Sequence, residues 1–65
     1  MDQESPIWRA PCANHPDLSV TVSRTVIGTY RAVFRDDEAG AIIETRIFTS
    51  RAVANAYARR LVNQP

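Results

Sequence analysis

Residues 30–48 read YRAVFRDDEAGAIIETRIF, and this stretch decides the fold because it has the pattern of a β-hairpin. Its first six residues alternate, so that Tyr30, Ala32 and Phe34 fall on one side and Arg31 and Arg35 fall on the other, with Val33 as the exception. Residues 36–40, DDEAG, form a polar turn, and Gly40 can take the left-handed conformation that closes it. The stretch therefore predicts two antiparallel strands joined by a short loop.

A further strand is expected before this hairpin. From Leu18 to Val26 the chain has an apolar residue at almost every second position, with serines and threonines between them. Arg24 breaks the apolar side, which indicates an exposed or bulged strand end. Gly28 offers the turn into the hairpin.

The second strand of the hairpin, residues 41–48, leaves two interpretations open. Ile43 and Ile47 point one way, whereas Ile42 and Phe48 point the other way with the charged residues. Either a β-bulge shifts the phase midway, or both faces carry apolar area. An exposed Ile42 beside Val33 would form an apolar patch suited to a protein partner.

A helix is expected after residue 50. Thr49 and Ser50 offer an N-cap, and apolar residues then recur at intervals of three and four. The predicted apolar stripe consists of Val53, Ala54, Tyr57, Ala58, Leu61 and Val62.

These elements predict an α+β fold in which one C-terminal helix packs on one face of a three-stranded antiparallel sheet, in the order β-β-β-α. The predicted domain spans residues 18–65. Residues 1–17 contain prolines at positions 6, 11 and 16, which favour a flexible or extended N-terminal tail. Whether Trp8 of this tail docks on the domain stays open.

Charge is distributed unevenly along the 65 residues, although the formal net charge is only +1. From Leu18 onward there are seven arginines against four acidic residues, and three of these acids lie in the predicted turn. A face of one sign attracts anionic partners. The absence of lysine is also typical of a chain encoded by a GC-rich genome, so the arginines have a compositional explanation as well.

Catalytic and metal sites are not expected. The chain lacks a nucleophile with its base and a pair of carboxylates in different environments, and Cys12 with His15 falls short of the four ligands of a structural zinc site. We therefore predict a non-catalytic protein without a cofactor, metal or small-molecule substrate. A single cysteine and the lack of an apolar run of membrane length predict a soluble, cytoplasmic protein.

Residues 29–61 resemble the arm-type DNA-binding domain of tyrosine recombinases and phage integrases. The resemblance is carried by Tyr30 to Asp36, the turn glycine Gly40, and the run from Phe48 to Tyr57. It implies a three-stranded sheet whose uncovered face lies in the major groove of DNA. It gives the DNA-facing role to Arg31, Arg35 and Arg46. The family tends to be basic after the turn glycine, whereas this chain reads AIIE at residues 41–44.

The leading functional hypothesis is therefore nucleic-acid binding, to DNA, through an arginine-bearing sheet face. Its candidate residues are Arg24, Arg31, Arg35 and Arg46. The alternative is a protein-interaction or homodimeric accessory protein, with Val33 and Ile42 on the interaction surface. A second resemblance, to small bacterial domains of uncharacterised function that self-associate, favours this alternative. The chain's small size also fits an accessory protein of a mobile element.

Overall fold

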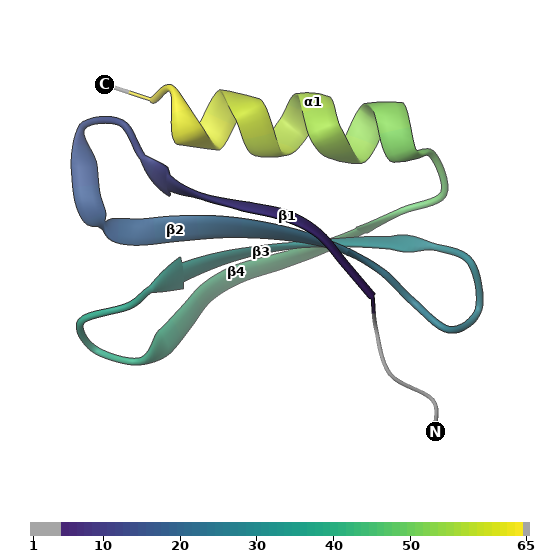
Figure 1. The fold of residues 1–65 in the computed structure, drawn as a ribbon, viewed down its shortest axis with the longest axis horizontal. Coiled ribbons are helices and arrows are strands. Elements are labelled where there is room, and N and C mark those ends of the chain that lie inside the picture. The colour runs from purple at the N-terminus through teal and green to yellow at the C-terminus, as the bar shows by residue number, and fades with distance from the viewer. Residues whose placement is uncertain (1–4, 65) are drawn as a thin grey trace.

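The computed structural model describes residues 5–64, which form a four-stranded antiparallel sheet and one C-terminal helix (Figure 1). The elements are β1 (Ser5–Cys12), β2 (His15–Arg24), β3 (Tyr30–Asp36), β4 (Ala41–Phe48) and α1 (Arg51–Val62). The strands lie in the order β1-β2-β3-β4, so each is hydrogen-bonded to its neighbour in sequence. The helix crosses one face of the sheet (Figure 1). The predicted α+β class, antiparallel sheet and C-terminal helix are confirmed.

The prediction of three strands is wrong, because the segment expected as a tail contains β1. This strand pairs along β2 from Ser5 opposite Arg24 to Cys12 opposite His15, with register shifts after Pro6 and after Pro11. Proline has no backbone N–H, so it is tolerated on an edge strand or at a bulge. β1 is an edge strand, and its prolines are therefore compatible with sheet pairing.

The register decides which side chains face the helix. Val20 lies opposite Ala10 and Phe34, and Val22 lies opposite Trp8 and Ala32. Directly opposed residues project to the same face of a sheet. These side chains therefore form the covered face of the sheet, beneath α1. Tyr30, Ala32 and Phe34 lie on the side predicted for them.

The core between sheet and helix is small. Val20 and Val22 are its largest fully buried side chains. The helix contributes Ala54 and Ala58, both completely buried, and their small side chains allow close contact with the sheet. Ser50 caps the helix, since its hydroxyl accepts a hydrogen bond from the Val53 backbone N–H at 3.4 Å. The other buried apolar residues are Cys12 and Ala32.

The structure confirms the turn of the hairpin and decides between the two interpretations of its second strand. Gly40 closes the turn with a φ of 69°, in the left-handed region. Of the two interpretations of β4, the bulge is present, because the register shifts where Phe34 pairs with Glu44 and Arg35 pairs with Ile42. Ile43 is therefore the extra residue on β4.

Replacing Val22 with alanine is expected to lower the free energy of unfolding by about 2 kcal/mol, from two lost methyl groups and the cavity that remains. Urea denaturation followed by circular dichroism would measure the change. Val53 is on the predicted apolar stripe of the helix yet is 53% exposed. Val26 is the matched control, because it is a valine in the turn after β2 and is 60% exposed. Its replacement by alanine should change stability by less than about 0.5 kcal/mol. Equal losses in the two variants would contradict this core.

Candidate functional site

The face of the sheet that α1 leaves uncovered, here called the open face, carries three arginines. Arg9 of β1 lies opposite Thr21, and Arg31 and Arg35 of β3 lie opposite Ser23 and Ser19. All three arginines alternate with residues of the covered face, so they project away from the helix. The floor beneath them consists of small polar side chains of β2, of which Ser19 is almost completely buried.

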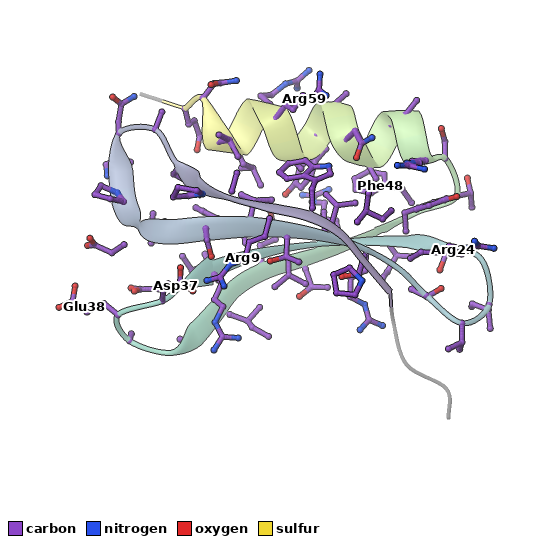
Figure 2. All side chains as sticks on the ribbon, viewed as in Figure 1. Arg9, Arg24, Asp37, Glu38, Phe48 and Arg59 are labelled. Atoms are coloured by element: carbon purple, nitrogen blue, oxygen red, sulfur yellow. The ribbon has the colours of Figure 1, made fainter. Side chains whose placement is uncertain are left out.

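Two of these arginines converge on one carboxylate, that of Asp37 in the β3–β4 turn. Arg9 Nη2 lies 3.0 Å from Asp37 Oδ1, and Arg35 Nε lies 3.5 Å from the same atom. Arg9 also donates a hydrogen bond of 3.5 Å to the Ser19 hydroxyl. The turn is held beside β2 because the Asp37 backbone N–H donates to the Asp17 carbonyl at 2.8 Å. Figure 2 shows Arg9 and Asp37 side by side, below the sheet and away from the helix.

The side chains of this cluster line a shallow depression of about 410 Å³ on the open face. Its walls are Pro6 and Arg9 of β1, Thr21 of β2, Arg35 of β3, and Asp37. Two guanidinium groups at its edge can hold one anionic group, and the Asp37 carboxylate occupies that role in this structure.

The structure separates the four arginines predicted as candidates. Arg31 and Arg35 share the open face. Arg46 lies opposite Ala32, which places it on the covered face, and its guanidinium carbon lies 5.5 Å from the centre of the Tyr57 ring. Arg24 is exposed at the end of β2 opposite Tyr30, far from Arg9 (Figure 2). Neither Arg24 nor Arg46 joins the open-face cluster.

The arginine that sequence reasoning missed is Arg9. It lies between Pro6 and Pro11, and these prolines favour a tail over a strand. A signal was present nonetheless: Trp8 and Ala10 flank Arg9, so an apolar–charged–apolar alternation occurs there.

Arg46 belongs to a second cluster at the rim of the covered face, with Glu44 and Tyr57. Arg46 Nη2 lies 3.4 Å from Glu44 Oε2, and the Tyr57 hydroxyl donates to Glu44 Oε1. The bonds from Tyr57 and Arg46 lower the pKa of Glu44. Burial, followed by the bond to Glu44, raises the pKa of Tyr57. Tyr57 also packs on Phe48, with ring centroids 5.3 Å apart, so this cluster joins the helix to β4.

Apolar side chains are exposed along β4. Ile42, Ile43 and Ile47 are 59%, 53% and 52% exposed. Ile42 and Ile47 lie opposite Arg35 and Arg31, on the open face. Val33, the other predicted interaction residue, lies on the same face and is half-buried. The open face thus has an arginine half over β1 and β3 and an apolar half at β4.

Other reactive groups do not gather into a site. Cys12 is buried, and burial raises the pKa of its thiol, which keeps it protonated. Within residues 5–64 there is no cluster of three or more histidine, cysteine, aspartate or glutamate residues that could hold a metal ion. In the part of the chain that the structure describes, no helix is both long enough and apolar enough to cross a membrane.

The Asp37 carboxyl is expected to titrate below its ordinary pKa of 3.8, chiefly because Ser19 donates a hydrogen bond to it and because Arg9 and Arg35 lie beside it. A pKa that is lower in the folded than in the unfolded chain adds stability above pH 3.8, and this contribution is lost as the pH falls through the folded value. NMR titration of the side-chain carboxyl would measure it. Ser19→Ala and Arg9→Ala should each raise the pKa of Asp37. A wild-type pKa above 3.8 would contradict the cluster.

Comparison with models of protein families, with curated proteins and with solved structures finds no match for this chain.

Proposed function

We propose that the protein is a small, non-catalytic domain that binds nucleic acid, namely duplex DNA, through the open face of its sheet. One observation carries this proposal: Arg9, Arg31 and Arg35 come from two strands and project from the face opposite the helix. Guanidinium groups suit phosphate oxygens and the edge of guanine, because both can accept two parallel hydrogen bonds.

The ion pairs of Asp37 are compatible with this role. Side-chain exposure is 60% for Arg9 and 46% for Arg35. Exposed ion pairs contribute only about 0–1 kcal/mol. Phosphate groups along a duplex can therefore replace one carboxylate at little cost. The β2 residues of the open face, Ser19, Thr21 and Ser23, have small side chains. On β3, Val33 lies between Arg31 and Arg35.

The resemblance to the arm-type domain of tyrosine recombinases supports the use of a sheet face in the major groove. The strand register gives the DNA-contacting role on this face to a different set of arginines. Arg46 turns toward the helix, and Arg9 of the additional strand β1 brings a third arginine to the open face. The proposed contact surface therefore consists of Arg9, Arg31 and Arg35.

A second candidate function is protein interaction, and the exposed isoleucines of β4 favour it. Large apolar side chains on an edge strand are a common mark of an interface. This surface lies at the β4 side of the sheet, directly beside Arg31 and Arg35.

The direct test is fluorescence anisotropy of labelled duplex DNA, with single-stranded DNA and duplex RNA in parallel, across a series of salt concentrations. If three arginines neutralise three phosphates of B-DNA, the logarithm of affinity should fall with the logarithm of salt at a slope of about −2.7. Binding to duplex DNA that does not change with salt, or no binding at low salt, would remove the proposal.

A further inference from the structure

The outer edge of β4 is free of any strand within residues 5–64, because β4 is the last strand of the sheet. Seven of its eight residues are exposed. Alternate residues of an edge strand direct unpaired backbone N–H and C=O groups outward, ready to pair with another strand. Edge strands are commonly protected by prolines, charged side chains or β-bulges. β4 has no proline, its bulge at Ile43 lies near the start of the strand, and its two charges, Glu44 and Arg46, are of opposite sign.

The sequence of β4 is complementary to itself. Residues 43–47 read IETRI, with Thr45 at the centre, opposite charges on either side of it and isoleucines outside them. When two copies of this segment lie antiparallel about Thr45, Glu44 of each copy lies opposite Arg46 of the other. Ile43 then lies opposite Ile47.

The faces agree with this pairing. Glu44 and Arg46 lie opposite Phe34 and Ala32 of β3, on the covered face. Thr45 and Ile47 lie opposite Val33 and Arg31, on the open face. Two copies paired through their edges keep the same faces on the same side. The charged pairs therefore meet on the helix side, and Thr45 and Ile47 of both copies lie on the open side.

Charge also excludes the neighbouring symmetric registers. Centring the pairing on Glu44 places two carboxylates directly opposite each other, and centring it on Arg46 does the same with two guanidinium groups. Like charges directly opposite destabilise a strand pair, whereas opposite charges stabilise it. Of these registers, only the one centred on Thr45 has complementary charges.

Apolar area lies on the helix side of this edge as well. Tyr57 contacts Phe48 and Arg46 of β4, so its side of the helix lies above β4. Val53 is one turn earlier on that side and is 53% exposed. A partner along β4 would cover Val53, Ile43 and Ile47. Such burial would add to a core in which Val20 and Val22 are the largest fully buried side chains.

We propose that a second copy of this chain pairs antiparallel with β4, centred on Thr45, so that the two sheets join into one of eight strands. The two-fold axis is perpendicular to the sheet, and it places both helices on one side and both sets of open-face arginines on the other. The proposal stands on the β4 edge alone and does not depend on nucleic-acid binding.

Charge reversal tests the register by sedimentation velocity over a range of protein concentrations. The wild-type chain should show a concentration-dependent dimer. Glu44→Arg alone, or Arg46→Glu alone, should weaken the dimer at least tenfold, because each places like charges opposite each other. The double variant restores complementary charges and should dimerise again. An equimolar mixture of the two single variants should form a heterodimer, since one chain then offers two arginines and the other two glutamates.

A disulfide trap gives a second readout that does not depend on charge. Thr45→Cys places two thiols directly opposite each other, and mild oxidation should produce a covalent dimer, which a Thr49→Cys variant should form much less readily. The wild-type chain is the control for the buried Cys12. Three results would overturn the proposal. They are a wild-type chain that stays monomeric at all concentrations, single charge variants that dimerise as well as the wild type, and equal cross-linking at positions 45 and 49. Circular dichroism of each variant verifies that it is folded.

Discussion

Replacing Trp8 with alanine is expected to lower the free energy of unfolding by about 3 kcal/mol, the lower end of the cost of removing a buried tryptophan. Trp8 is half-buried and packs against the core from β1. Its indole Nε1 donates a hydrogen bond of 2.9 Å to Asn55 Oδ1 of the helix. The side chain therefore connects the first strand to α1. A domain of this length is stabilised by only about 3–10 kcal/mol in total, so the loss should unfold a large share of the molecules.

Two control variants separate the contributions of the indole. Asn55→Ala removes only the hydrogen-bond acceptor and should cost about 1 kcal/mol. Ile27→Ala shortens a side chain that is 82% exposed, and it should have an effect of less than about 0.5 kcal/mol. Because the chain has one tryptophan, unfolding must be followed by circular dichroism. A Trp8→Ala variant as stable as the wild type would mean that β1 is not part of the stable domain.

The parts of the fold that the sequence predicts are those set by local patterns. The alternation at residues 30–36, the left-handed glycine at position 40 and the cap at Ser50 each depend on neighbours a few residues away. Short-range patterns of this kind are strong signals for strands, turns and helix starts. They suffice for the hairpin, the helix and the side of β2 and β3 that the helix covers.

The errors come from features that depend on position within the whole sheet. Proline opposes a strand in the interior of a sheet and is tolerated at its edge, and the sequence alone does not reveal that residues 5–12 lie at an edge. The sequence alone also does not decide that β4 has a bulge at Ile43. This bulge determines which residues of β4 face the helix. Arg46 therefore turns to Tyr57 and away from Arg31.

The candidate site could likewise be predicted only in part, namely where it depends on a local pattern. Arg31 and Arg35 follow from the alternation of one strand, and the structure places both on the open face. Arg9 joins them only because β1 pairs with β2. Asp37 reaches Arg9 because the β3–β4 turn is bonded to the start of β2, a contact between segments that are 20 residues apart in sequence.

Simultaneous replacement of Arg9, Arg31 and Arg35 by glutamine is expected to weaken binding to duplex DNA by about two orders of magnitude at roughly 0.1 M salt. Each phosphate contact contributes about 0.9 to the slope of affinity against salt on logarithmic scales, so three lost contacts should leave the slope close to zero. Glutamine keeps a polar side chain of moderate length at each site. The change therefore removes charge with little effect on the sheet.

The matched control replaces Arg51, Arg59 and Arg60 by glutamine, all of which are exposed on the helix. Both triple variants lose the same charge, so any difference between them reports the face on which the charge lies. The decisive measurement is the affinity of the two triple variants for one labelled DNA duplex at the same low salt concentration. The open-face variant should bind about a hundredfold more weakly than wild type, with the helix variant within a few-fold of it. Equal losses in the two variants, or a greater loss in the helix variant, would contradict the assignment of nucleic-acid binding to the open face.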